Sequence, residues 1–252
     1  MFSNFDFNVI ERSWKYLFFE GMVFTLELTA LAMVGGIIMG TMLALARLSS
    51  IKPLSVVAGG YVNLVRSIPL VLVIFWFYFL VPYIGSWVIG IFSGIAPGAV
   101  AWLLDTLGVR WTAGQPIKVG AFSSCLITFI MFEACYYCEI MRAGIQSIPR
   151  GQVSAGYALG LTYWQAMGSI VLPQAFRNMT PVLLTQTVVL FQDVSLVYVL
   201  SITDFVGAAS KVAQRDGRLV EMYLFVALVY FVLCFGLSSA VKKFQNKIAI
   251  IR

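Results

Sequence analysis

The sequence has no histidine and few charged residues, and each scarcity excludes a class of protein. Histidine is the commonest acid–base catalyst and metal ligand, so its absence from the 252 residues argues against a catalytic or metal-binding centre. Charged residues make up only 11% of the chain, whereas 60% of the residues are hydrophobic. This balance excludes a soluble domain and a disordered chain. It predicts an all-α integral membrane protein with room for five or six helices of roughly 20 residues.

The sequence also lacks signals for ATP binding, secretion and nucleic-acid binding. The chain has no GxxxxGK[ST] motif, so it is not expected to bind ATP or its Mg²⁺. No cleavable signal peptide is expected, because the first twenty residues carry acidic and aromatic side chains. The net charge of +6 does not indicate nucleic-acid binding, since the basic residues lie at the ends of apolar blocks. All four cysteines lie in apolar stretches, where packing is the expected role: Cys125, Cys135, Cys138 and Cys234.

Five apolar blocks are long enough to span a membrane. Gly36 and Gly40 form a GxxxG pair in the first block, which predicts close helix packing. The segment 83–118 is apolar but rich in glycine and proline, so we expect it to lie at the membrane surface rather than to form a sixth span. Residues 1–252 are therefore expected to form a single transmembrane domain. The predicted spans are approximately residues 21–46, 55–80, 119–141, 181–200 and 222–241.

The distribution of charge predicts the orientation. With five spans and the N-terminus outside, the cytoplasmic segments hold nine basic and no acidic residues, whereas the outer segments hold seven of each. The positive-inside rule favours this arrangement, in which the C-terminus is cytoplasmic. A sixth span would place the loop 143–180 outside. The five-span topology instead makes that loop the longest cytoplasmic segment.

The cytoplasmic loop carries the stretch SAGYALGLTYWQAMGSIVLP, which begins at Ser154. It resembles the EAA loop of ABC-importer permeases, in which a short helix of small residues docks on an ATPase. The first position is Ser154 rather than glutamate, so the missing polar contact either comes from elsewhere, with Gln152 as a candidate, or is absent. An ordinary amphipathic loop helix is the alternative. The residues that match the motif are Ser154, Ala155, Gly156, Gly160, Ile170, Leu172 and Pro173.

Three further segments extend the resemblance over almost the whole chain: RSIPL from Arg66, EIMRAGIQSIPRGQ from Glu139 and FQDVSLVYVL from Phe191. They are similar to polar amino-acid permeases. Within that family, four segments most resemble the permease subunits of glutamate/aspartate importers: FWFYFLVP, MFEACYYCEIMRAGIQSI, TQTVVLFQDVSLVYVLSITDF and QRDGRLVEM. The resemblance implies the five-helix type I importer fold in the bacterial cytoplasmic membrane. It implies that the lipid-embedded chain works with an ATPase dimer that binds ATP and Mg²⁺, a second permease, identical or homologous, and an external amino-acid-binding protein.

Charged residues inside a bilayer are costly, so those in the predicted spans are candidates for a site. Asp193 could bind the ammonium of an amino acid, with Gln192 and Ser195 on its carboxylate; alternatively, Asp193 pairs with Arg66 and only holds the bundle together. Arg66 could grip a substrate carboxylate or satisfy carbonyls at a kink before Pro69. Glu133 is expected to make a structural pair, because it would repel an anionic substrate.

Two other functions compete with the importer permease. An ATPase-independent secondary transporter should show an internal repeat across the two halves, and we find none. An intramembrane enzyme would need a nucleophile–base pair or a cluster of metal ligands, and the sequence suggests neither.

Overall fold

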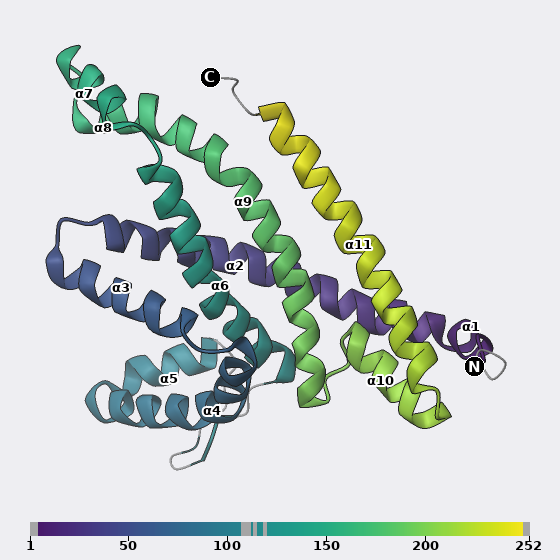
Figure 1. Cartoon of the computed structure of the whole chain (residues 1–252). Helices are drawn as coiled ribbons and strands as arrows, with labels where there is room; N and C mark the ends of the chain where they lie inside the picture. The colour runs from purple at the N-terminus through teal and green to yellow at the C-terminus, as the bar shows by residue number, and fades with distance from the viewer. Residues whose placement is uncertain (1–4, 107–111, 113–114, 118–119, 249–252) are drawn as a thin grey trace.

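The computed structural model describes residues 5–106, 112, 115–117 and 120–248, which contain helices and connections but no β-strand (Figure 1). The expected all-α fold is therefore confirmed. Two π-helical turns join consecutive helices without a loop, and one 3₁₀ turn extends α9 to Leu200. In chain order the elements are α1 (Asn8–Lys15), η1 (Tyr16–Met22), α2 (Val23–Leu48), α3 (Lys52–Arg66), α4 (Leu70–Ile95), α5 (Pro97–Thr106), α6 (Ala121–Gln146), α7 (Arg150–Ala158), α8 (Tyr163–Ala166), η2 (Met167–Val171), α9 (Leu172–Asp193), η3 (Val194–Leu200), α10 (Phe205–Asp216) and α11 (Leu219–Ile248).

Four helical stretches of the described chain are long and apolar enough to cross a membrane, and a bent pair of helices provides a fifth. They overlap all five predicted spans, although the helices extend beyond the predicted ends. The four stretches are Asn8–Leu48, Ala121–Gln146, Tyr163–Leu200 and Leu219–Lys247. Residue 119, where the third span was predicted to begin, lies outside the described residues.

The second predicted span, 55–80, is not one straight helix. Its two halves, Lys52–Arg66 and Leu70–Leu80, meet at an angle of 108°. Pro69 explains the break, because proline lacks an N–H and disfavours helical geometry in the residue before it. The hydroxyl of Ser67 turns back to donate to the carbonyl of Asn63 at 2.7 Å, which satisfies one helix-end acceptor. The sequence predicted a kink here, and the structure has a sharp corner.

The predicted loop 143–180 is much shorter in the structure, because helix occupies both of its ends. Helix α6 continues to Gln146, and from Tyr163 the chain is helical through to Leu200. Thr162 starts this second helix with a capping box, in which its hydroxyl accepts from the backbone N–H of Gln165. The short helix that the EAA-like motif predicted is α7, and a second helix follows it. Only α7 and two short connections separate the helices.

The segment 83–118 is largely helical where the structure describes it. Helix α4 runs through Pro82 to Ile95, and α5 follows. The chain then returns against α4, where the N–H of Ile117 donates to the carbonyl of Pro82 at 3.0 Å. The apolar part of this segment within α4, Pro82–Ile95, is shorter than a membrane span.

The glycine pair of the first span makes the packing contact that the sequence predicted. A Cβ on Gly40 would lie 2.8 Å from the Cβ of Tyr137 and 3.0 Å from the carbonyl oxygen of Ala134. A Cβ on Gly36 would meet the Tyr137 ring at 3.0 Å. Only glycine at these positions lets α2 approach α6 so closely.

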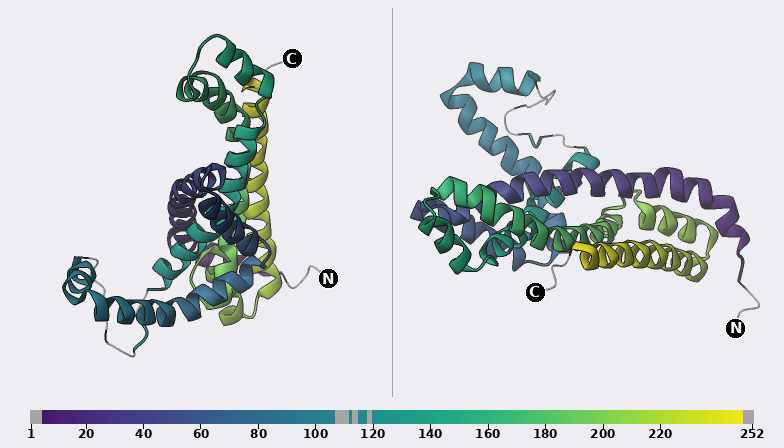
Figure 2. Two further views of the ribbon diagram at one scale, coloured as in Figure 1. Left: turned by 90° about the vertical axis from the view of Figure 1, so that its left-hand side faces the viewer. Right: turned by 90° about the horizontal axis from the view of Figure 1, so that it is seen from above.

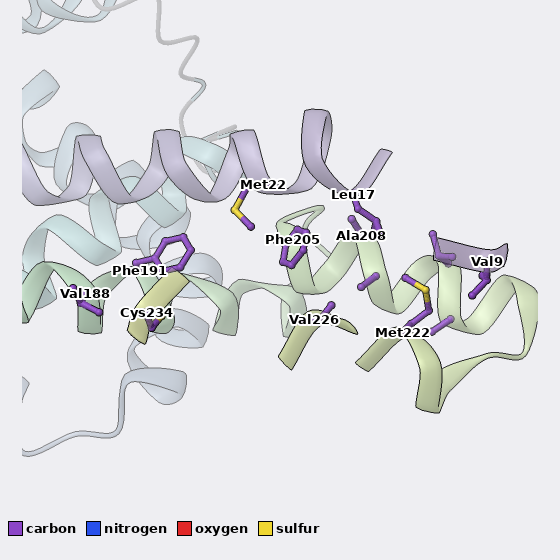
Figure 3. Close-up of a cluster of buried hydrophobic side chains, with 13 residues drawn as sticks. Val9, Leu17, Met22, Val188, Phe191, Phe205, Ala208, Met222, Val226 and Cys234 are labelled. Atoms are coloured by element: carbon purple, nitrogen blue, oxygen red, sulfur yellow. The ribbon is translucent and has the colours of Figure 1, made fainter. Parts of the chain in front are cut away.

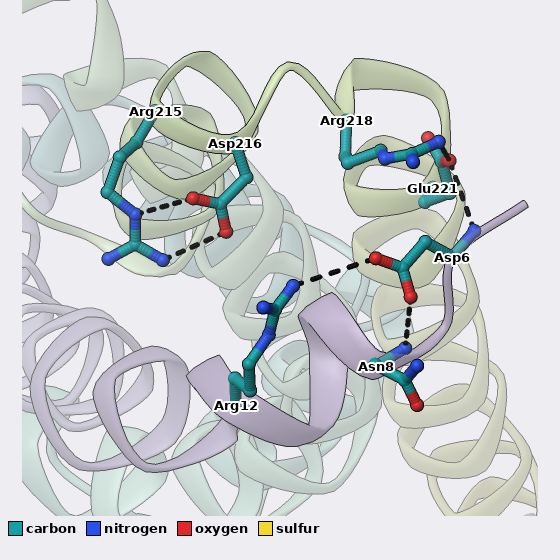
Figure 4. A network of polar contacts seen from close by, with 7 residues as sticks. All are labelled: Asp6, Asn8, Arg12, Arg215, Asp216, Arg218 and Glu221. Carbon is teal, nitrogen blue, oxygen red and sulfur yellow. Dashed lines mark hydrogen bonds and ion pairs between the residues drawn. The ribbon is translucent and has the colours of Figure 1, made fainter.

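A second contact region joins the N-terminal helices to α10 and α11. Val9, Leu17 and Met22 pack with Phe205 and Met222 in a buried apolar cluster (Figure 3). At its edge, hydrogen bonds and ion pairs link the N-terminal segment with the corner between α10 and α11 (Figure 4). The residues of this polar network are Asp6, Asn8, Arg12, Arg215, Asp216, Arg218 and Glu221.

The two ends of the molecule are distinct. The C-terminal end of α11 and helices α7 and α8 lie at one end, whereas α1 and α10 lie at the other (Figures 1 and 2). The element that resembles a coupling loop therefore shares its end of the molecule with the last helix. Charge counting placed both on one side of the membrane, and in the structure both lie at one end of the molecule.

Candidate substrate site and coupling region

A cavity of about 360 Å³ lies where the corner between α3 and α4 meets α6 and α9. Arg66 lines it from the corner, Tyr136 from α6, and Gln186 and Asp193 from α9. Gln186 and Asp193 are seven residues apart, which places both on one face of a helix. The volume lies in the range of sites that hold small molecules.

Asp193 has no partner within the described chain. It is half-buried, and none of the described residues forms a hydrogen bond or an ion pair with it. The alternative in which Asp193 pairs with Arg66 to hold the bundle is therefore not what the structure shows. A half-buried carboxylate without a partner is costly, so its presence at a cavity favours a role in binding a cation.

Arg66 lies at the corner with its guanidinium over the ring of Tyr136, 5.2 Å from the ring centroid. Its Nη1 is 3.7 Å from Oε1 of Glu139, beyond hydrogen-bond distance. The side chain is 39% exposed, so the guanidinium remains accessible at the cavity. Rather than bonding to the carbonyls at the break, Arg66 is held by an aromatic face and a loose ion pair.

Glu133 is fully buried and has an amide as its partner. The Nε2 of Gln186 donates to its Oε2 at 3.1 Å and lies 3.4 Å from Oε1. Glu133 therefore has the structural role that the sequence predicted, and its contact fixes the Gln186 amide at the cavity. The sequence analysis did not identify Gln186. Its spacing of seven residues from Asp193 was the only available signal.

Gln192 and Ser195 do not line the cavity. Gln192 is exposed on a neighbouring face of α9, because one residue along a helix turns the side chain by about 100°. Ser195 belongs to the 3₁₀ turn after α9. The structure thus brings together Arg66 and Asp193 out of the four candidate residues, and adds Gln186 and Tyr136.

The charges of the cavity suit a zwitterion. Asp193 supplies a carboxylate for an ammonium, Arg66 supplies a planar donor pair for a carboxylate, and Gln186 supplies an amide. An α-amino acid carries both complementary charges, on two groups bonded to the same carbon. The arrangement can bind such a molecule, although it has no nucleophile–base pair among the described residues of the cavity.

The coupling motif forms a helix–turn–helix element at one end of the molecule (Figure 1). Helix α7 ends at Ala158, and Gly160 has a φ of +83°, a conformation that side chains other than glycine rarely adopt. This confirms that Gly160 turns the chain. Ser154 and Ala155 are exposed on α7.

The small residue Gly156 has an internal packing role. It is buried, and a Cβ at this position would lie 2.7 Å from Cδ1 of Ile170. The motif residues Gly156 and Ile170 therefore pack against each other and hold α7 on the next helix. Leu172 is half-buried and Pro173 is exposed at the start of α9, where the π turn η2 precedes the proline.

The surface of this element is apolar and exposed. Leu159 is 84% exposed and Trp164 is 78% exposed, and Tyr157 and Tyr163 lie nearby in the chain. Exposed large apolar groups gathered at one tip are typical of a docking surface. The side chain of Gln152 accepts a hydrogen bond from Nε2 of Gln174 at 2.7 Å, so it links α7 to the start of α9.

A multi-span helical chain with a cavity that suits a zwitterion and an exposed apolar helix–turn–helix element at one end has the architecture of a transport permease. The sequence profile of the family "Binding-protein-dependent transport system inner membrane component" matches residues 32–250. The chain belongs to this family, and it is thus a transport component of the inner membrane.

Individual relatives cover nearly the whole chain. The glutamate/aspartate import permease protein GltK of Escherichia coli O157:H7 is 48% identical over 97% of this chain and 99% of its own length. The L-cystine transport system permease protein TcyB of Bacillus subtilis is 28% identical over 92% of this chain and 86% of its own. A crystal structure of an amino acid ABC transporter with histidines superposes with a TM-score of 0.78 at 28% identity, covering 97% of this chain and 99% of the other.

A more distant structure, the methionine ABC transporter MetNI in an inward-facing conformation, has a TM-score of 0.65 at 16% identity. It covers 93% of this chain and 97% of the other chain. At that identity it shows the fold alone. The ABC-importer permease fold predicted from the sequence is confirmed by these matches.

Proposed function

We propose that this chain is the permease subunit of an ATP-driven importer for glutamate and aspartate. The observation that carries the proposal is that one cavity contains both a carboxylate without a partner in the described chain, Asp193, and an accessible guanidinium, Arg66. The high identity to a glutamate/aspartate import permease supports the substrate class.

In the proposed binding mode Asp193 receives the ammonium of the amino acid and Arg66 receives a carboxylate. A guanidinium matches a carboxylate with two parallel hydrogen bonds, which fixes its orientation. Gln186 is held by Glu133 and adds a polar contact from the same helix face as Asp193. Gln192 and Ser195 stay as sequence predictions without a place in this cavity.

Energy would come from a separate ATPase dimer, which holds the ATP and Mg²⁺. The element formed by α7, Gly160 and α8 would dock on that dimer through its exposed tip, and its movement would drive alternating access. The N-terminus would be outside and the C-terminus cytoplasmic. A second permease and an external binding protein complete the proposed complex.

The test is uptake of labelled glutamate, aspartate, glutamine and arginine by vesicles that contain the purified complex. We expect ATP-dependent uptake of glutamate and aspartate that requires the binding protein. Replacement of Gly160 by a bulky residue should release the ATPase and stop uptake. Uptake that persists without any ATPase would refute the proposal in favour of a secondary transporter.

A further inference from the structure

A second cavity, of about 400 Å³, lies beside the first and toward the coupling element. Arg66 lines both cavities. The first cavity meets α6 near Tyr136, whereas the second meets it at Glu139, Ala143 and Ser147. Because α6 ends at Gln146, next to α7, the second cavity is displaced toward the end of the molecule that carries the coupling element.

The surroundings of the second cavity have a surplus of positive charge, because Arg66 and Glu139 line it and two further arginines bond to Glu139 from outside the lining. Oε1 of Glu139 accepts from Arg47, and Oε2 accepts from Nε and Nη2 of Arg142 at 2.9 and 2.7 Å. Both oxygens are thus occupied, and Arg66 is left 3.7 Å away. Three guanidinium groups surround one carboxylate, which leaves two positive charges unbalanced around Glu139.

The two cavities differ in what they offer a cation. The first contains Asp193 without a partner, but the second has no unpaired carboxylate among its described lining residues. The other polar groups of the second cavity bond to each other, since Nδ2 of Asn178 donates to the hydroxyl of Ser147 at 2.9 Å. Electrostatics in this cavity therefore favour an anion over a cation.

We infer that the second cavity is a transient binding site for the carboxylate of an acidic amino acid on its way to the cytoplasm. Arg66 contacts the substrate in both cavities and passes it from the first to the second, where Arg47 and Arg142 supply additional attraction. Glu139 keeps this positive cluster from holding the anion too tightly. The inference rests on the proposed function, because it needs a substrate with a net negative charge.

Ala143 offers a test that leaves the ion-pair network intact. It lines the second cavity, it is exposed, and it takes no part in the pairs around Glu139. Glutamate and glutamine have similar size and similar helix propensity, so Ala143→Glu and Ala143→Gln differ mainly in charge. The complete reconstituted complex with its binding protein and ATPase is used throughout.

We expect glutamate uptake by Ala143→Glu to be about fivefold below that of Ala143→Gln, as one unit charge across a water-containing cavity would cause. The difference should shrink as the salt concentration on the cytoplasmic side rises. Equal uptake by the two variants, with equal recovery of complex, would overturn the inference.

Ala143→Lys separates the effect of side-chain charge from that of side-chain size, and it provides a second measurement if the glutamate variant does not assemble. We expect its glutamate uptake to match or exceed that of Ala143→Gln. An equal loss in the lysine and glutamate variants would overturn the inference in favour of a steric effect. If the wild-type complex takes up no acidic amino acid, the proposed function fails first and the inference fails with it.

Discussion

Replacement of Asp193 by asparagine removes one charge from the first cavity and keeps the shape of the side chain. Asp193 has no partner within the described chain, so this change breaks no internal contact and should leave folding and assembly intact. Its effect should fall on the substrate ammonium. A hydrogen bond between charged groups contributes about 1.5 to 3 kcal/mol, which corresponds to a roughly 10- to 100-fold loss of affinity.

Two assays measure this loss in the reconstituted complex: uptake of labelled glutamate, and ATP hydrolysis stimulated by the loaded binding protein. We expect Asp193→Asn to lower both at a fixed glutamate concentration, with recovery of complex unchanged. The matched control is Gln192→Ala, because Gln192 is adjacent in the chain but lies exposed on another face of α9. Normal uptake and stimulation in Asp193→Asn would remove Asp193 from the site and refute the proposed binding mode.

Three further predictions concern packing and capping. Gly156→Val should displace Ile170 and reduce the amount of ATPase that co-purifies with the chain, because a Cβ already meets Ile170 at 2.7 Å. Gly40→Leu should separate α2 from α6 at Tyr137 and lower the melting temperature of the detergent-solubilised complex. Asp204→Ala should cost about 1 kcal/mol and expose α10 to protease, since Asp204 accepts from the first two backbone N–H groups that follow Phe205.

The two glycine substitutions have matched controls elsewhere in the chain. Nothing lies within 4 Å of a Cβ built on Gly151 or Gly60, so alanine at either position should be tolerated. Unchanged co-purification in Gly156→Val would contradict the packing role of Gly156, and an unchanged melting temperature in Gly40→Leu would contradict the close approach of α2 and α6. Full protease resistance in Asp204→Ala would show that its capping bonds contribute little.

The pH dependence of stability gives an additional test at Asp204. Burial raises the pKa of this carboxyl from its ordinary value of 3.8 to about 6, against the opposing effect of the backbone N–H groups of Gly207 and Val206. Between these two values the folded chain binds a proton that the unfolded chain releases, so stability should fall as the pH rises from about 4 to 6. Asp204→Asn should lack this component of the pH profile. An identical profile in both proteins would exclude Asp204 as its source.

The sequence predicted best the features that depend on local pattern. Gly36 and Gly40 signalled a close helix contact, and the motif from Ser154 to Pro173 signalled a short helix that ends in a turn at Gly160, because spacing along a helix determines which residues share a face. The corner at Pro69 was foreseen as a kink. Its angle was not, because packing of α4 against α6 rather than the proline alone decides where the chain goes next.

Features that depend on distant contacts were missed. The pairing of Glu139 with Arg142 was visible at a spacing of three residues, but the approach of Arg47 and Arg66 requires three helix ends to converge. Gln186 carried no local signal strong enough to mark it as a cavity residue. Buried Ala175 and Met179 pack the N-terminal half of α9 against Gly144 of α6, a contact between distant residues that the sequence does not show.

The helical run from Tyr163 to Asp193 joins the exposed tip to the candidate substrate cavity without an intervening loop. At 1.5 Å per residue it forms a rod of about 45 Å. A tilt of about 5° applied at one end of such a rod displaces the other end by about 4 Å. A displacement delivered at the tip would therefore move the Asp193 carboxylate by more than the length of a hydrogen bond. Such leverage could make or break the contact between Asp193 and a bound substrate directly.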